Sequence, residues 1–200
     1  MAGKIIVGVD EAGRGPLAGP VYAACVILDP SKKIDGLNDS KKLTHKKREE
    51  LYDKIIKNSF AYGIGYATHD EIDTINILNA TILAAKRGLE NIRTSSEHGI
   101  NHFNTDHSDR YILNDGNIYF FKGIYPGEAV VKGDTKIEEI MAASILAKVS
   151  RDRFMLEASK DYPEYGFEKH KGYPTQSHYE AIRKYGASPI HRLTFKGVKQ

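Results

Sequence analysis

Two apolar segments joined by a short stretch rich in glycine and proline constrain the fold of the N-terminal part. Residues 4–9 and 20–28 both have the apolar, β-branched composition of strands. The connection between them is too short for a crossover helix, so we expect an antiparallel hairpin. Asp10 and Glu11 stand where the first strand ends, and the turn continues as Gly13-Arg14-Gly15.

The adjacent carboxylates of Asp10 and Glu11 need a compensating charge. Successive strand side chains point to opposite faces, but a turn at the strand end lets both approach one site. Like charges this close together are costly unless cations or protons neutralise them. Gly13 and Gly15 lack a Cβ, which allows a ligand's backbone to come near. The pattern therefore predicts metal-dependent chemistry on a phosphate backbone.

Two simpler interpretations compete with a metal site. A strand-end aspartate often only caps a turn. Gly13, Gly15 and Gly19 also give a G-x-G-x-x-x-G spacing, which is one residue longer than the dinucleotide-binding fingerprint. Pro16 removes a donor N–H from this turn, and the acidic pair would repel a pyrophosphate. Dinucleotide binding is therefore disfavoured.

Two further strands lead into aspartates. Residues 110–114 precede Asp115-Gly116, and residues 129–132 precede Gly133-Asp134. Taken singly, Asp115 is typical of an Asp-Gly turn and Asp134 of a helix N-cap. Active residues commonly lie at strand ends in α/β folds, so we expect these carboxylates to converge with Asp10 and Glu11 at one sheet edge. Hard oxygen ligands of this kind favour Mg²⁺ or Mn²⁺.

The other predicted elements complete an α/β pattern. A strand is expected over residues 60–67, and Thr44 is expected to cap the first helix. Helices are expected over residues 45–58, 76–92, 136–155 and after Thr175; loops are expected over 29–44 and 94–109. Three strands, helices, two strands and further helices follow one another along the chain.

Composition sets broad limits on the class of protein. The 200 residues suffice for one domain with a real core, and a net charge of +3 is compatible with nucleic acid. Cys25 is the only cysteine, which excludes an intrachain disulfide and a cysteine-rich zinc site. No apolar run reaches the length of a membrane span and no signal-peptide pattern is present, so we expect a cytoplasmic protein.

Several motifs in the same order resemble those of bacterial type 2 ribonuclease H (ribonuclease HII), and together they extend over nearly the whole chain. They are the segments at residues 10–21, 38–43, 114–116, 132–134, 142–152, 171–175 and 191–192. The resemblance implies a ribonuclease H-like α/β fold with a mixed five-stranded sheet flanked by helices. It also implies a single catalytic domain over residues 1–200, with residues 160–200 forming a helical C-terminal extension.

The activity implied by this resemblance is metal-dependent endonucleolytic hydrolysis. The RNA strand of RNA–DNA hybrids would be cut, and single ribonucleotides embedded in duplex DNA would be incised on their 5′ side, leaving 3′-OH and 5′-phosphate ends. The family's metal-binding carboxylates correspond to Asp10, Glu11, Asp115 and Asp134. They would hold Mg²⁺ or Mn²⁺, which stabilises the attacking and leaving oxygens of phosphodiester hydrolysis.

Substrate contacts are implied for a second set of residues. Backbone groups of Gly13, Arg14 and Gly15 would bond the 2′-OH, the group that distinguishes RNA from DNA. Tyr173 would pack on the neighbouring deoxyribose. The candidates for phosphate positioning are Lys41, Lys42, Lys148 and Arg151. His178 and His191 either assist near the site or satisfy local hydrogen bonds.

Alternatives from other classes stay open at this point. They are a non-catalytic duplex-binding protein, a different nuclease or integrase on the same sheet, and a type 3 enzyme, which would carry an extra N-terminal domain. The segment 94–108 is longer than is usual in the family, and its His98-x-x-x-His102 spacing is compatible with zinc on a helix, although its composition favours a surface loop. A monomer without membrane association is expected, and recruitment by a sliding clamp or polymerase is left undecided.

Overall fold

A mixed sheet forms the centre of the computed structural model, which describes residues 4–94 and 110–199. The strand order is β4-β3-β2-β1-β5-β6. The strands are β1 (Ile5–Ala12), β2 (Val21–Ile27), β3 (Ala61–Ala67), β4 (Arg93–Thr94), β5 (Arg110–Asp115) and β6 (Gly127–Val130). β1 to β4 pair antiparallel, whereas β5 runs parallel to both β1 and β6. The five predicted strands are confirmed, and β4 adds a two-residue edge.

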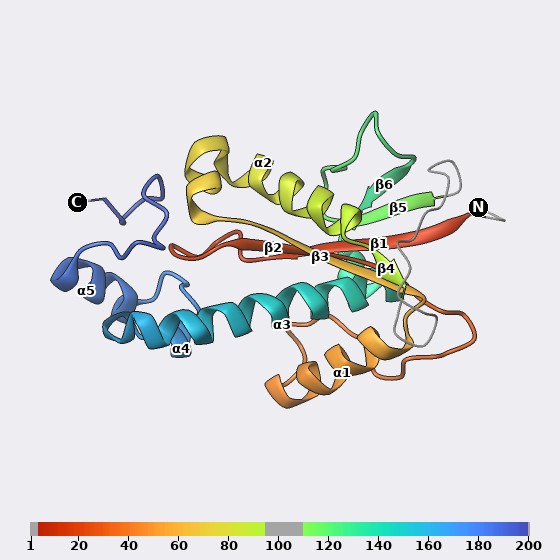
Figure 1. The fold of residues 1–200 in the computed structure, drawn as a ribbon, viewed down its shortest axis with the longest axis horizontal. Helices are drawn as coiled ribbons and strands as arrows, with labels where there is room; N and C mark the ends of the chain where they lie inside the picture. The colour runs from red at the N-terminus through yellow and green to blue at the C-terminus, as the bar shows by residue number, and fades with distance from the viewer. Residues whose placement is uncertain (1–3, 95–109, 200) are drawn as a thin grey trace.

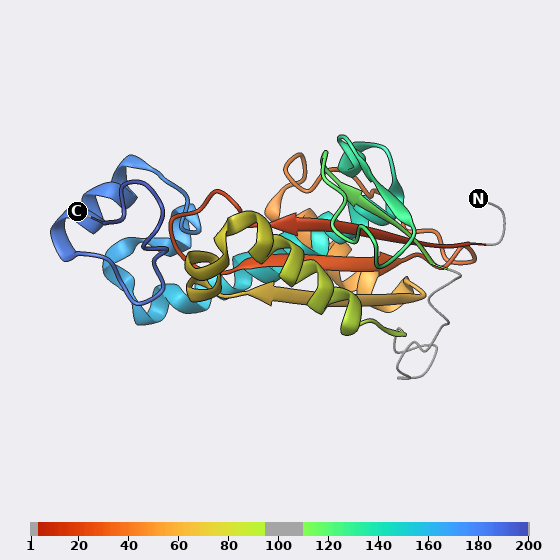
Figure 2. The same cartoon turned by 90° about the horizontal axis from the view of Figure 1, so that it is seen from above.

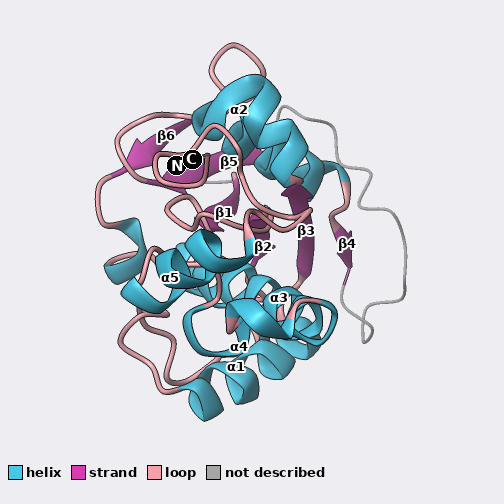
Figure 3. Ribbon diagram, turned by 90° about the vertical axis from the view of Figure 1, so that its left-hand side faces the viewer, coloured by secondary structure: helices cyan, strands magenta, loops and turns pink. Residues whose placement is uncertain are grey.

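Helices cover both faces of this sheet (Figure 1). The α-helices are α1 (His45–Asn58), α2 (His69–Glu90), α3 (Glu138–Asp161), α4 (Phe167–His170) and α5 (Gln176–Tyr185). α2 lies on one face, and α3 with α1 lies on the other, as the end-on view in Figure 3 also shows. The short helices α4 and α5 lie at the end of the sheet toward which β1 points (Figure 2).

Alternation along the strands sends side chains into two cores. Val7, Val9 and Cys25 belong to the core under α2, whereas Ala24 and Val26 belong to the core under α3. This is the period of two that a strand covered on both faces requires.

Close packing of β3 against α2 depends on glycines. A Cβ on Gly63 would lie 2.1 Å from the carbonyl oxygen of Gly88, and one on Gly65 would lie 2.3 Å from that of Ala84. Only residues without a side chain allow the helix backbone to approach the strand this closely.

α2 begins earlier than the sequence pattern predicts. Thr68 accepts from the Glu71 N–H while the Glu71 carboxylate accepts from the Thr68 N–H, a complete capping box. The helix is interrupted at Asn76, whose φ is 68°. Its Oδ1 accepts from the N–H groups of Leu78 and Asn79. Asn76 therefore starts the second segment, which is the helix predicted over 76–92, and the first segment was missed.

Other boundaries differ by a few residues. β1 extends through Asp10 and Glu11 rather than ending before them, and β6 covers 127–130 rather than 129–132. α3 covers 138–161 rather than 136–155. The predicted loop at 94–109 falls almost entirely outside the described residues, as do His98 and His102. In the described ranges, no helix combines the length and apolarity needed to cross a membrane.

Candidate active site

Parallel pairing of β1 with β5 brings the first and second acidic segments together. Val9 pairs with Asn114, so Asp10 and Asp115 come next along two adjacent parallel strands, at the same end of both. Asp134 lies in the 3-10 turn η3 (Gly133–Thr135), which follows β6 on the other side of β5. The predicted convergence therefore follows from the order of three neighbouring strands.

A hydrogen bond joins two of these segments directly. The Gly133 N–H donates to Asp115 Oδ1 over 2.7 Å. Lys132 before it has a φ of 57°, the left-handed conformation that turns the chain out of β6 and into η3. Asp134 is therefore neither a strand end nor the cap of a long helix, and its turn is attached to β5.

Two of the acidic residues, Asp10 and Asp134, are buried, Glu11 and Asp115 are partly buried, and their negative charges repel one another. Asp10 is 5 % exposed. Burial, followed by the nearby charges of Glu11 and Asp115, raises its pKa well above the usual range, although a hydrogen bond from Ser144 opposes this. Burial also raises the pKa of Glu11 and of Asp134, with Asp115 contributing to both. A cation among these groups would relieve the repulsion.

Each carboxylate already has a partner within the protein. Asp10 Oδ1 accepts from the Glu11 N–H over 2.8 Å, and Glu11 Oε1 lies 3.5 Å from Arg14 Nη1. Asp134 Oδ2 lies 3.6 Å from Lys41 Nζ. Burial alone would lower the pKa of Lys41, but the surrounding carboxylates, Asp134 first, raise it.

The donor chemistry fits Mg²⁺ or Mn²⁺, whereas the side-chain arrangement is not that of a formed metal site. Across the described part of the chain, no three His, Cys, Asp or Glu side chains are placed to hold a metal ion. The lysine of one ion pair and the arginine of the other are 78 % and 46 % exposed. Exposed ion pairs contribute little, so releasing Asp134 and Glu11 from them costs about 1 kcal/mol or less each.

A groove of about 440 Å³ adjoins the carboxylates and collects most of the predicted substrate residues. Glu11, the turn Gly13-Arg14-Gly15, Lys41, Lys148 and Tyr173 all line it. Tyr173 is 41 % exposed, and its Cε1 would lie 3.9 Å from a Cβ on Gly15. The aromatic ring therefore stands directly beside the glycine turn.

The predicted basic residues have different environments. Lys148 Nζ lies 2.8 Å from Asp152 Oδ1 and 5.8 Å from the centre of the Tyr173 ring. Lys42 is exposed and does not line the groove. Arg151 is wrong as a phosphate ligand, because it is 1 % exposed and its three side-chain nitrogens donate to main-chain carbonyls.

Sequence reasoning missed two supports of this groove. Ser40 and Ser144 are buried with their hydroxyl oxygens 2.9 Å apart, connecting the segment before α1 to α3. Arg192 is fully buried against the glycine turn. Ser40 and Arg192 both fall in motifs carried by the family resemblance, but no periodicity signals their burial.

His178 and His191 form a hydrogen bond with each other and do not line the groove. Their Nε2 atoms are 3.0 Å apart. His178 Nδ1 must donate to the Tyr173 carbonyl, and His191 Nδ1 must accept from the Ser188 N–H. His191 therefore carries its proton on Nε2 and donates to His178. This places both imidazoles in a structural chain of hydrogen bonds behind Tyr173.

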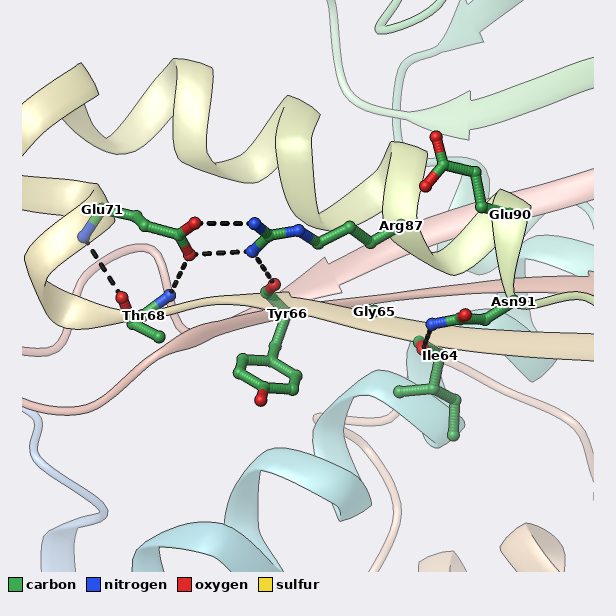
Figure 4. Close-up of a pocket in the computed structure, with 8 residues that line it drawn as sticks. All are labelled: Ile64, Gly65, Tyr66, Thr68, Glu71, Arg87, Glu90 and Asn91. Carbon is green, nitrogen blue, oxygen red and sulfur yellow. Dashed lines mark hydrogen bonds and ion pairs between the residues drawn. The ribbon is translucent and has the colours of Figure 1, made fainter.

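A second hollow, of about 520 Å³, lies between β3 and α2 and is shown in Figure 4. Arg87 forms a two-pronged ion pair with Glu71 and donates to the Tyr66 carbonyl, while Asn91 donates to the Ile64 carbonyl. These bonds cover the outer edge of β3 beyond β4. The hollow is therefore explained by the protection of a sheet edge.

The fold has close counterparts among solved structures. Ribonuclease H2 from Pyrococcus horikoshii OT3 superposes with a TM-score of 0.73 and 30 % identity, over 96 % of this chain and 94 % of that one. A ribonuclease HIII solved in complex with Mn²⁺ shares the fold at 15 % identity, with a TM-score of 0.70 over 98 % of this chain and 68 % of that one. The molecule is thus a nuclease of the ribonuclease H class.

Sequence comparisons narrow this class to one family. The model of the family described as "Ribonuclease HII" matches residues 7–198. A ribonuclease HII from Marinomonas sp. (strain MWYL1) is 52 % identical over 99 % of this chain and 93 % of its own length. One from Francisella philomiragia is 50 % identical over 98 % of both chains. The chain belongs to the ribonuclease HII family.

Proposed function

We propose that the chain hydrolyses the RNA strand of RNA–DNA hybrids and incises duplex DNA on the 5′ side of single ribonucleotides, leaving 3′-OH and 5′-phosphate ends. One observation carries the proposal: Glu11 lines the groove together with the glycine turn and Tyr173, and Lys41, which also lines it, forms an ion pair with Asp134. Carboxylates that can bind metal ions for phosphodiester hydrolysis thus lie next to a surface that can contact a sugar.

Asp10, Glu11, Asp115 and Asp134 are the proposed metal ligands. Bound Mg²⁺ or Mn²⁺ supplies the positive charge that stabilises phosphodiester hydrolysis. The mutual rise in carboxylate pKa supports this assignment, because such a site gains most from a divalent cation. Lys41 neutralises Asp134 in the structure, and its exposed ammonium group is free to rotate onto a substrate phosphate when the carboxylate takes a cation.

Selectivity for ribose is assigned to the turn Gly13-Arg14-Gly15. The Arg14 and Gly15 N–H groups have no acceptor among the described residues. Gly15 presents no side chain to the groove, so a sugar hydroxyl can reach this backbone. The 2′-OH is the group that such donors would bind.

Tyr173 is proposed to pack on the deoxyribose next to the ribonucleotide. Its exposed ring faces the groove, and its backbone is fixed because the Tyr173 N–H donates to the His170 carbonyl while its own carbonyl accepts from His178. Lys148, near this ring, and Lys42, outside the groove, remain candidates for phosphate contacts.

We further propose that residues 1–200 act as one catalytic domain, with residues 160–200 as its helical C-terminal extension. The protein would work as a cytoplasmic monomer in the removal of ribonucleotides from DNA. A structural neighbour from Archaeoglobus fulgidus was solved as a complex with PCNA, at 21 % identity.

Cleavage of a duplex with one central ribonucleotide tests the function. The same duplex without the ribonucleotide, and an RNA–DNA hybrid, are incubated in parallel with Mg²⁺, Mn²⁺ or EDTA. We expect metal-dependent cutting 5′ to the ribonucleotide and in the hybrid, with the all-DNA duplex intact. Binding without cutting by metal-loaded protein would favour a non-catalytic duplex binder. Equal cutting of all-DNA duplex would favour a different nuclease.

A further inference from the structure

Two buried arginines hold the loop that contains the glycine turn. Arg192 Nη2 donates to the Gly13 carbonyl over 2.6 Å, Nη1 to the Arg14 carbonyl over 3.0 Å and Nε to the Gly19 carbonyl over 2.9 Å. Arg192 is fully buried. Every nitrogen of its guanidinium is thus committed to the main chain of one loop.

Arg151, on α3, fixes the other side of the same loop. It donates to the carbonyls of Ala18, Pro20 and Lys171 over 3.0 to 3.1 Å. A Cβ on Gly13, whose φ is +102°, would lie 2.1 Å from Arg151 Nε. The Lys171 carbonyl also attaches the segment that leads to Tyr173. The two arginines therefore set the turn and the tyrosine segment against one another.

The direction of these bonds determines where the amide protons point. None of the described peptide bonds is cis. In a trans peptide the C=O and the next N–H point in opposite directions. Because Arg192 binds the Gly13 and Arg14 carbonyls, the N–H groups of Arg14 and Gly15 face away from it. These two N–H groups have no acceptor in the described part of the chain, and their residues line the groove.

Burying a guanidinium group costs free energy, so its burial here indicates that its position serves a purpose. A charge removed from water needs compensating hydrogen bonds, here from directed carbonyl dipoles. A lysine at this position would keep the charge but lose the planar fork that reaches three carbonyls at once. Arg192 is also fixed in place, because its own N–H donates to the Leu17 carbonyl over 2.8 Å.

We propose that Arg192 is a positioning residue for ribose recognition: it orients the Gly13 and Arg14 peptides so that the Arg14 and Gly15 N–H groups donate to the 2′-OH of the nucleotide in the groove. This inference rests on the proposed function and assigns a role to a side chain that does not itself touch substrate.

Metal-free binding separates this role from a purely structural one. Fluorescence anisotropy in EDTA gives the Kd for a labelled duplex with one ribonucleotide and for the same duplex with deoxyribose at that position. We expect the native protein to prefer the ribonucleotide duplex about 5- to 13-fold, since one hydrogen bond contributes about 1 to 1.5 kcal/mol. Arg192→Lys should reduce that ratio to below about 2, while the Kd for all-DNA duplex stays within about twofold.

Arg183→Lys is the matched control, because Arg183 is exposed on α5 and does not line the groove. It should keep the native ratio. A native ratio in Arg192→Lys would overturn the positioning role and leave the proposed function standing. Absence of any preference in the native protein, together with uniform cutting of ribonucleotide and all-DNA duplexes, would instead overturn the proposed function and this inference with it.

A measurement on the native protein covers the case in which Arg192→Lys does not fold. With ¹⁵N-labelled protein in EDTA, the amide signals of Arg14 and Gly15 and the guanidinium N–H signals of Arg192 are followed by NMR during titration. Both sets should shift differently with the ribonucleotide duplex than with the all-DNA duplex. Identical shifts for the two duplexes would overturn the inference.

Discussion

Asn114 shows how one polar side chain prepares the acidic end of the sheet. It is fully buried, and its amide nitrogen donates to the carbonyls of Asp115 and Ile118 while its oxygen accepts from the Phe120 N–H. These bonds close the turn after β5. The polar residue is accommodated because all of its hydrogen-bonding groups are satisfied.

Removing one acidic charge tests the metal assignment. Asp134→Asn preserves size but removes the charge that would help to hold a cation, so turnover should fall by about 100-fold or more. Binding of an RNA–DNA hybrid in EDTA should change little. Single-turnover cleavage and anisotropy measure the two effects. Asp161→Asn is the control, because Asp161 is exposed at the end of α3. Near-native cleavage by Asp134→Asn would show that Asp134 is not part of the metal site.

Tyr173 offers a test of the sugar contact. Tyr173→Ala should lower kcat/KM at a single ribonucleotide by about 10- to 100-fold, which is the range expected for loss of an aromatic stacking platform. Tyr173→Phe keeps the ring and should stay within a few-fold of the native rate. Steady-state cleavage assays give kcat/KM for both variants and for the native protein. An unchanged rate for Tyr173→Ala would refute the packing role.

At the scale of elements, the interruption of α2 makes Asn76 an internal cap. Asn76→Ala loses the cap and places a Cβ-bearing residue without local hydrogen bonds at positive φ, so the free energy of unfolding should fall by about 2 kcal/mol. Asn76→Gly loses the cap but tolerates the backbone, so its loss should be smaller. Urea unfolding measures both. Asn79→Ala, at an exposed helix position, is the control and should leave the free energy of unfolding unchanged or slightly increased. Equal losses of stability for Asn76→Ala and Asn76→Gly would contradict a role for the backbone conformation at this position.

Sequence patterns predicted most elements because local periodicity encodes them. The hairpin, α1 with its Thr44 cap, β3 and the second segment of α2 all follow from alternation, helical spacing or caps. The sequence analysis also expected Asp10 and Asp115 to converge at one edge of the sheet, and the pairing of β1 with β5 brings them there. The sequence did not reveal the burial of Arg151 and Arg192, because this burial depends on non-local contacts. Both side chains donate hydrogen bonds to carbonyls of a loop more than 130 residues away in the sequence.

At the scale of the whole molecule, the C-terminal part is held by groups that must stay neutral. Burial lowers the pKa of both His178 and His191 to about 4. In the unfolded chain histidine titrates near pH 6.5. Between these values the unfolded state binds more protons, so the stability contributed by the pair is present above about pH 6.5 and is lost as the pH falls toward 4.

Urea unfolding at pH 7 and pH 5 tests this dependence. The buried acidic residues, whose pKa values are raised, act in the opposite sense, so the comparison is made between native protein and His178→Asn. The asparagine amide can still donate to the Tyr173 carbonyl but does not titrate in this range. We expect a smaller loss of stability on acidification in the variant. An equal pH dependence in both proteins would show that the histidine pair is not its source.

The bonds from Arg192 to Gly13 and Arg14 have a consequence during synthesis. The turn leaves the ribosome before Arg192, which lies 179 residues after Gly13. Chains still being translated can form the hairpin of β1 and β2 without having the turn peptides fixed in their final orientation. Competence to recognise a ribonucleotide would then arise only after Arg192 has emerged, so a nascent polypeptide that still lacks this residue would not yet distinguish ribose from deoxyribose.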